Sequence, residues 1–413
     1  MPEPLIKNDA VVFGIIMALL AVIFHTSSSR HPLFRKFYKY VPSLVLCYFL
    51  PGLLTTLGVF SPEHSQLYTV ASRFLLPASL VLFTLSVDLA AIIRLGKKAV
   101  ILFFAGSISV IIGGPLVLKL FSWIDPAILG TAGANETWRA MATLAGSWIG
   151  GAANQAALRE VFRPSNELFA SFVTVDVLVG NLWTAFLLFG AARAPAWDER
   201  RGADTAAISE MQQKASQFLA KAARIPTLAD LMAILAIGFS FTGIAHACAD
   251  ALAPWIQMHA PQLEKFSLTS AFFWVVVIAT ALGIAASFTR LRNLEGAGAS
   301  RIGSVLLYIL IATVGMGMDL RAIFRNTEFF LIGFLWISFH ATIMLTVGKL
   351  LRAPFFFVAV SSEANIGGAA SAPVVAAAFH PSLAPVGVLL AVLGYAVGTY
   401  GGWLCGILMQ AVK

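Results

Sequence analysis

Apolar runs long enough to cross a bilayer recur along the whole chain, from about residue 10 to residue 410. A helix of about 20 apolar residues spans the hydrocarbon core, and a spanning helix satisfies its own backbone hydrogen bonds there. The sequence therefore predicts an all-α, polytopic membrane protein whose first partner is the lipid bilayer. Ten spans are predicted, at 10–25, 41–60, 71–93, 99–121, 167–191, 228–252, 268–288, 302–323, 329–350 and 383–410.

The composition excludes a water-soluble domain. Of 413 residues, 59% are hydrophobic and 12% are charged, and the mean hydropathy is +0.84, far from the values of soluble domains. The formal net charge of +8 does not indicate nucleic-acid binding, because Lys and Arg occur in short clusters between the apolar runs. Such clusters orient membrane spans.

Two further apolar stretches, 136–162 and 355–380, are interrupted by Gly, Ser, Asn and Pro. Irregular backbone at membrane depth is tolerated only where it is buried in protein or lines a water-filled cavity. In secondary transporters, such broken helices hold the substrate or the coupling ion near the midplane. We therefore expect the functional site at these two stretches.

Three pairs of similar segments indicate an internal duplication. The pairs occur in the same order along the chain and are VDLAAIIR (87–94) with MDLRAIFR (318–325), IGGAANQAAL (149–158) with IGGAASAPVV (366–375), and EVFRPS (160–165) with AAFHPS (377–382). The predicted organisation is a first transmembrane repeat over 1–191, a linker over 192–227 and a second repeat over 228–413.

The positive-inside rule gives the two repeats opposite orientations. The basic loop 26–40 and the linker are predicted to be cytoplasmic, with the N-terminus outside, if the first interrupted stretch enters the membrane and returns. The turn at 318–325 then lies outside although its counterpart at 87–94 lies inside. The prediction is an inverted repeat of about five spans each, with one broken, Gly-rich helix per repeat. Arg321 and Arg325 fall on the outer side, which the rule does not favour.

Polar residues cluster around the paired glycines of the two interrupted stretches. Half-helix N-termini at such breaks attract anionic groups, and side-chain oxygens and amides suit a polar solute or a sodium ion. The alternative is close helix packing, which also uses small residues. The predicted substrate-binding residues are Ser147, Gly150, Gly151, Asn154, Gln155, Ser362, Asn365, Gly367, Gly368 and Ser371.

Asp176, Glu363 and Asn181 are the predicted ion-coupling residues. Ionisable groups at membrane depth are costly and often mark an ion or proton path. Asp176 lies in the middle of an otherwise uncharged run and is the first candidate, while Asn181 follows five residues later. Two alternatives stay open: Asp176 bonded to a broken-helix amide as a structural group, and Glu363 near the surface, paired with Arg352 or Lys349.

No sequence motif indicates an enzyme. GMGMD at 315–319 places its Asp one position later than an intramembrane aspartyl protease requires, and GSWIG at 146–150 is not a GxSxG elbow. No Walker A or HExxH motif is present. The three cysteines show no disulfide or metal-ligand spacing. We expect no metal site and no cofactor, apart from a sodium ion that could serve as the coupling ion.

The broken segments GSWIGGAANQAAL and SSEANIGGAASAPVVAAAF resemble the membrane family known as domain of unknown function 819 over nearly the whole chain. That family is grouped with the cation:proton antiporter and anion transporter superfamily, which includes the sodium:glutamate symporters. The resemblance implies an elevator-type carrier, with a mobile core built from the broken segments, a scaffold built from the early spans of each repeat, ion coupling and a homodimer. The glycine-rich signature of the glutamate carriers is absent here.

The leading interpretation is a secondary active transporter, coupled to sodium or protons, in the cytoplasmic (inner) membrane of a bacterium. Its predicted substrate is a small polar organic solute, anionic solutes included. The alternative is a cation:proton antiporter without an organic substrate, and a cavity large enough for an amino acid or a sugar acid would favour the solute carrier. An intramembrane enzyme or a sensor would need a catalytic pair or a signalling domain, and the sequence indicates neither.

Overall fold

The computed structural model describes residues 4–41, 43–87, 96–203, 225–266, 268–317, 328–380 and 383–412, and these form helices and no strand. The helices are α1 (Asp9–Ser27), α2 (Pro32–Tyr40), α3 (Ser43–Thr56), α4 (Leu67–Val70), α5 (Leu76–Leu85), α7 (Lys97–Ile124), α8 (Thr137–Gly150), α9 (Ala152–Phe162), α10 (Asn166–Ala191), α11 (Ala194–Arg201), α13 (Leu228–His259), α14 (Ala271–Ser287), α15 (Ala299–Met316), α16 (Glu328–Leu350), α17 (Phe355–Ile366), α18 (Gly368–Phe379) and α19 (Ala384–Gln410).

Each of the ten predicted spans coincides with a helix, and eight helices in the described part of the chain are long and apolar enough to cross a membrane. The second span is shorter than predicted: α3 has 14 residues and ends just before Gly58, whose φ of 74° lies in the left-handed region where helices end. The seventh, α14, has 17 residues and bends by 96° into the 3₁₀ segment Arg290–Ala297.

The surface of α7 shows how these helices meet lipid. Its exposed side chains recur every three or four residues, while Leu102, Phe103 and Val110 are buried. This is the single-face pattern of a helix with one side against protein. A contiguous apolar stripe on the other side fits a lipid-facing surface. The exposed residues of this stripe include Ile101, Phe104, Ile108, Ile112, Leu116 and Leu120.

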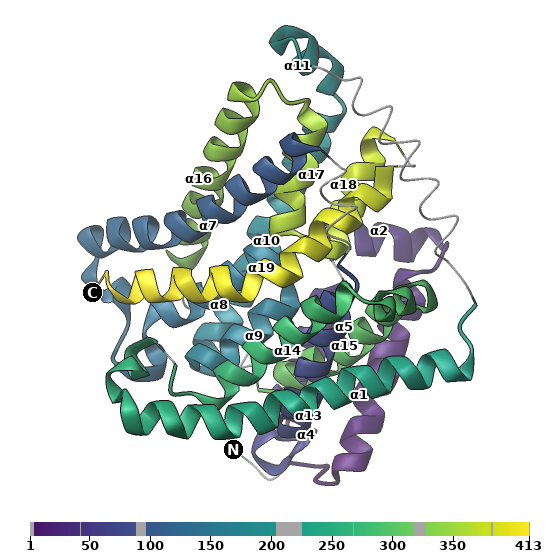
Figure 1. Ribbon diagram of the computed structural model, residues 1–413, viewed down its shortest axis with the longest axis vertical. Helices are drawn as coiled ribbons and strands as arrows, with labels where there is room; N and C mark the ends of the chain where they lie inside the picture. Colours follow the sequence, from purple (N-terminus) through teal and green to yellow (C-terminus); the bar gives the residue numbers. More distant parts are fainter. Residues whose placement is uncertain are drawn as a thin grey trace.

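The helices fall into two groups by their contacts. The scaffold group contains α1, α3, α5, α13, α14 and α15, and the core group contains α7–α10 and α16–α19. In Figure 1, α13 lies along the lower edge and α16 lies on the opposite side of the molecule. Contacts between the repeats are reciprocal, because α3 packs on α15 as α14 packs on α5, and α10 packs on α16 as α19 packs on α7. A duplicated chain would give this pattern, and the inverted repeat stays a prediction.

The two interrupted stretches fold as re-entrant helical hairpins. In hairpin 1 (α8–α9), Arg139 Nη1 donates to Phe162 O at 2.7 Å, so its two ends lie together. In hairpin 2 (α17–α18), the ring of Phe379 lies 5.3 Å from that of Phe356 at the other end. Each stretch therefore enters the molecule and returns on the same side.

The two hairpins enter from opposite ends of the core group. Beside the entrance of hairpin 2, Lys98 in the first turn of α7 donates to Arg352 O at 3.2 Å. The entrance of hairpin 1 follows the far end of α7, where Gly130 pairs with Glu136. The 28 residues of α7 separate the two entrances by about 40 Å.

Segments predicted to share one side of the membrane contact each other. Ser86 Oγ donates to Glu295 at 2.5 Å, and Phe355 N donates to Asp198 Oδ1 at 2.8 Å. On the other side, Lys119 Nζ donates to Val412 O at 3.5 Å. Which of these sides is cytoplasmic stays a prediction. Most of the linker, and the repeated segments from residue 88 and from residue 318, lie outside the described residues.

Candidate functional site

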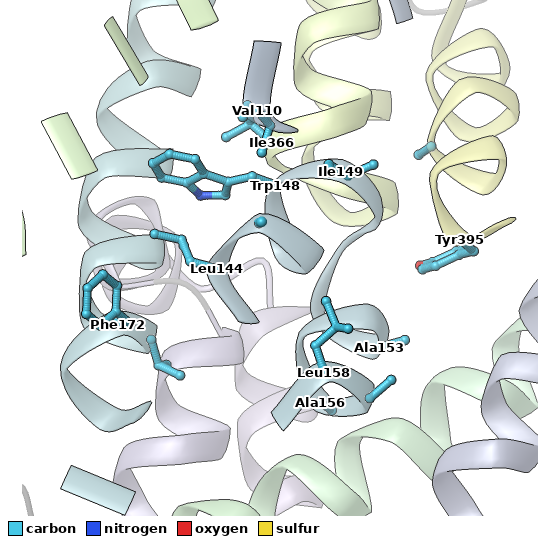
Figure 2. Close-up of a cluster of buried hydrophobic side chains, with 14 of the residues drawn as sticks. Val110, Leu144, Trp148, Ile149, Ala153, Ala156, Leu158, Phe172, Ile366 and Tyr395 are labelled. Atoms are coloured by element: carbon cyan, nitrogen blue, oxygen red, sulfur yellow. The ribbon is translucent and has the colours of Figure 1, made fainter. Parts of the chain in front are cut away.

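The tips of the two hairpins meet. Gly151 separates α8 from α9 with a φ of 84°, and Gly368 opens α18 with a φ of 58°. A methyl group at Gly368 would lie 3.5 Å from Gly151 Cα, which is ordinary van der Waals contact. Figure 2 shows the chain leaving one helix after Ile149 and entering the next before Ala153. The glycines that the sequence analysis paired thus lie within one methyl group of each other.

In each glycine pair, the two glycines have different structural roles, and these roles are the same in both pairs. The second glycine, Gly151 or Gly368, adopts a backbone conformation that other residues rarely take. The first glycine allows a close approach: a side chain at Gly150 would overlap the backbone of Gly394 in α19, and one at Gly367 would overlap Glu363 and Ser371. Close packing and the helix break, which the sequence analysis treated as alternatives, therefore both occur.

A cavity of about 310 Å³ lies beside the meeting point of the tips. The scaffold group contributes Ser43, Leu44, Phe83, Ser304, Leu307, Tyr308 and Ile311 to its wall. Seven predicted site residues also line it, namely Ser147, Gly151, Asp176, Asn181, Gly367, Gly368 and Ser371. The cavity therefore lies between the core group and the scaffold group, with both hairpin tips in its wall.

Asp176 is the only charged residue among the described residues of this wall. It lies half-buried on α10, where Oδ2 accepts from Ser147 Oγ at 2.6 Å and Oδ1 accepts from Trp148 Nε1 at 2.8 Å. Both donors are side chains of α8, not amides of the break. Hydrogen bonds to each oxygen stabilise the ionised form of a carboxylate, and these two bonds hold the Asp176 carboxyl group in place at the cavity wall.

The other predicted residues hold the hairpins in place instead of lining the cavity. Asn154 donates to Gly150 O at 2.8 Å and accepts from Thr399 Oγ1 at 2.6 Å, so it ties hairpin 1 to α19. Asn365 accepts from Ser107 Oγ at 2.8 Å and donates to Phe103 O, so it ties hairpin 2 to α7.

Gln155 and Ser362 also lie outside the cavity wall. Gln155 is buried, and its side-chain oxygen and nitrogen have no hydrogen-bond partner among the residues that the structure describes. Ser362 accepts from Trp183 Nε1 at 2.9 Å and lies 2.7 Å from His340 Nε2.

Glu363 lies directly behind the cavity wall, on α17. It is fully buried, and Oε1 accepts from Thr184 Oγ1 at 2.7 Å. Among the described residues it forms no ion pair with Arg352, Lys349 or any other cation. The alternative of a surface carboxylate paired with a base therefore does not describe Glu363.

One helix, α10, bonds to both hairpins. Asp176 accepts from Ser147 and Trp148 of hairpin 1, whereas two turns later Trp183 and Thr184 donate to Ser362 and Glu363 of hairpin 2. This polar face of α10 runs from one hairpin to the other past the cavity.

His340, Trp183 and Thr184 were not among the predicted site residues. His340 is fully buried on α16, with Nδ1 at 2.7 Å from Ser109 Oγ and Nε2 at 2.7 Å from Ser362 Oγ. A histidine in an apolar run is a detectable signal, because ionisable groups are rare there. Thr184 gives a weaker signal, its position two turns after Asp176 on the same helix.

A family model described as "Protein of unknown function (DUF819)" matches residues 14–412. The chain is also similar to the uncharacterized membrane protein YjcL of Bacillus subtilis (strain 168). The two are 24% identical over 361 residues, which cover 85% of this chain and 86% of that protein. The family match includes both hairpins, α10 and every residue of the cavity wall.

Proposed function

Because the chain belongs to the DUF819 family of membrane proteins, we propose that it is a secondary active transporter of a small polar organic solute, driven by a sodium or proton gradient. The predicted membership of this family is confirmed. Membership of the superfamily of the cation:proton antiporters and sodium:glutamate symporters stays a prediction.

The observation that carries the proposal is the contact between two glycine-broken hairpins beside a cavity. Gly151 and Gly368 lie so close that a methyl group on Gly368 would reach Gly151 Cα, and the N-terminal residues of α9 and α18 lie in the cavity wall. Helix termini leave backbone N–H and C=O groups without intrahelical partners, and these groups bind polar guests. A bound solute would satisfy them at the point where the two repeats meet.

The volume of the cavity favours a solute carrier over a cation:proton antiporter without an organic substrate. About 310 Å³ is at the lower end of small-molecule sites, whereas a bare cation needs far less space. The wall also includes the stacked rings of Phe83 and Tyr395, with centroids 4.3 Å apart. A flat apolar surface of this kind suits an organic group.

The charges of the wall favour a solute that carries a positive group. Among the described residues of the wall, Asp176 supplies the only formal charge, and the N-termini of α9 and α18 supply partial positive charge. A zwitterion of amino-acid size would place its ammonium group toward Asp176 and its carboxylate toward the hairpin tips. A purely anionic solute would need a bound cation to offset Asp176.

The transport step that we propose is a movement of the core group against the scaffold group, as in an elevator. Support comes from the cavity wall, to which both groups contribute. The protein would act as a carrier and not as an enzyme, without a cofactor, as a homodimer in the bacterial inner membrane. Asp176 would hold the solute, and the coupling ion would enter through the same cavity.

A thermal-shift screen of the purified protein tests this function. Amino acids, organic anions, amines and sugars are added with sodium chloride or with potassium chloride. A ligand at 100 times its Kd stabilises the folded state by about 2.7 kcal/mol, so a true solute raises the melting temperature.

The screen is repeated with Asp176→Asn and with Asp250→Asn, an exposed Asp on α13 outside the cavity. We expect solute binding and gradient-driven uptake into proteoliposomes to be lost in Asp176→Asn and retained in Asp250→Asn. If no solute binds the wild-type protein, or if Asp176→Asn transports normally, the proposed function is wrong.

A further inference from the structure

The two carboxylates beside the hairpin tips have different surroundings. Asp176 lines the cavity, and each of its oxygens accepts one hydrogen bond. Glu363 is fully buried and accepts hydrogen bonds from Thr184 and Ser371, while its Oε2 has no partner among the described residues. A fully buried carboxylate with one unpaired oxygen and no counter-ion among the described residues is very costly. The structure therefore favours an ionised Asp176 but not an ionised Glu363.

The hydrogen bonds of Thr184 also favour a protonated Glu363. Its Oγ1 lies 2.7 Å from Glu363 Oε1 and 3.1 Å from Gly180 O, but a hydroxyl has only one proton to donate. If Glu363 is protonated, its O–H donates to Thr184 Oγ1, and Thr184 donates to Gly180 O. Every proton then has an acceptor, and Oε2 is left as a neutral carbonyl oxygen, which costs far less than a bare charge.

The neighbouring network shows that complete pairing is attainable here. Ser109 donates to Gly106 O at 2.6 Å and so accepts from Nδ1–H of His340, whose Nε2 accepts from Ser362. Ser362 in turn accepts from Trp183. A neutral His340 thus gives every hydrogen bond of this network its proton. At Glu363, by contrast, the single proton of the Thr184 hydroxyl faces two acceptors, so one hydrogen bond lacks a proton unless Glu363 carries it.

A short route connects Glu363 to the cavity. Thr184 and Ser371 both line the cavity, and Thr184 is bonded to Glu363 Oε1. A methyl group at Gly367 would overlap both Glu363 Oε1 and Ser371 Oγ, so both oxygens pack against this glycine. One hydroxyl group therefore separates the buried carboxyl from the cavity.

Among the side chains that the structure describes, no charged group of the packed helices is paired with Glu363. Helix α17 packs on α7, α8, α10, α11, α16, α18 and α19. Of their titratable groups, Asp176 and Tyr395 line the same cavity, and His340 reaches the adjacent Ser362. The remaining charged residues of these helices whose side chains are described lie near helix ends or on the short α11, namely Lys97, Lys98, Lys119, Arg139, Glu167, Asp198, Glu199, Arg200, Glu328 and Lys349.

We propose that Glu363 is the proton-binding site of this protein, that Thr184 is the positioning residue between it and the cavity, and that Asp176 stays ionised toward the solute. A hydronium ion in the cavity gives a proton to Thr184 Oγ1 and is left as water, while the Thr184 hydroxyl passes its own proton to Glu363 Oε1; release runs the same two transfers in reverse onto a water molecule. The role of this proton in coupling depends on the proposed carrier function, but the site itself does not.

Infrared spectroscopy of the protein in liposomes tests the site without a solute. A protonated buried carboxyl gives a carboxylic C=O stretch that shifts in D₂O. We expect this band at neutral pH in the wild type and in Asp176→Asn, and its loss in Glu363→Gln. The control Glu199→Gln, at an exposed carboxylate, should leave the band unchanged. A wild type without the band, or a band lost only in Asp176→Asn, would overturn the proposal.

Thr184→Val separates a positioning role from a purely structural one. Valine keeps the shape of the side chain but removes the hydroxyl. The C=O band of Glu363 should remain and move to higher frequency, because the carboxyl loses its hydrogen bond with Thr184. An unmoved band would show that Thr184 does not hold Glu363.

A salt series separates a proton from a sodium ion. Melting temperatures are compared in sodium chloride and potassium chloride at equal ionic strength. We expect no sodium-specific stabilisation that Glu363→Gln removes; if there is one, Glu363 binds sodium and the proposal is wrong. If no solute is found but the Glu363 band is present, the carrier function fails while the proton site stands.

Discussion

At the scale of single residues, the glycines of the two breaks could be predicted from the sequence, and most of the polar contacts could not. The repeated IGGAA pattern predicted Gly151 and Gly368, because a helix break at membrane depth is tolerated only where it is buried in protein or lines a cavity. Whether Asn154 faces a cavity or a neighbouring helix depends on Thr399, 245 residues away. The local pattern of residues holds no information about such a partner.

Gly150 gives a prediction at this scale. A methyl group there would overlap the backbone of Gly394, so Gly150→Ala should lower the free energy of unfolding by about 1–3 kcal/mol, as expected for overpacking. The matched control is Gly243→Ala on α13, where no atom lies within 4 Å. The control should be neutral or slightly stabilising. Thermal unfolding in micelles measures both, and equal melting temperatures would contradict the close contact between α8 and α19.

At the scale of elements, composition predicted two interrupted stretches but could not decide whether they cross the membrane or return. A broken crossing and a re-entrant hairpin have the same residues, and contacts at the ends make the difference. Arg139 bonds to Phe162 O, and Phe356 packs on Phe379. The polar face of α10 was only partly predictable, because Thr184 resembles the many hydroxyls that bond within their own helix.

The entrance of hairpin 2 gives a prediction about an element. Phe355 N, at the start of α17, donates to Asp198 Oδ1 at 2.8 Å, while Pro354 before it provides no side-chain cap. Asp198→Ala should destabilise the protein by about 1 kcal/mol, the usual cost of a lost cap. Glu199→Ala, at the exposed neighbouring position, should be close to neutral. Chemical unfolding of both variants checks this, and equal stability would show that Asp198 does not support the hairpin.

At the scale of the whole molecule, the family resemblance implied a core and a scaffold, but the boundary between the two groups of helices is visible only in the structure. The cavity lies at that boundary, and Tyr400 of the core group donates to Val277 O of the scaffold group at 3.4 Å. An elevator movement would break this contact. A carrier whose two groups stay fixed and that opens only a local gate would keep this contact. The Tyr400–Val277 contact therefore distinguishes the two transport mechanisms.

A cross-link across this boundary should therefore stop transport but not binding. The pair Tyr400→Cys and Val277→Cys is joined by a short thiol reagent, with the exposed Cys248 replaced beforehand. The control pair is Lys119→Cys and Val412→Cys: in the wild type the Lys119 side chain likewise donates to the backbone oxygen of its partner, Val412, but this contact joins the ends of α7 and α19 within the core group. We expect solute uptake into proteoliposomes to fall to background only in the first pair, and solute-induced thermal stabilisation to remain in both. Normal uptake with the boundary cross-linked would mean that the core group does not slide against the scaffold group, and solute would then have to reach the hairpin tips through a local opening.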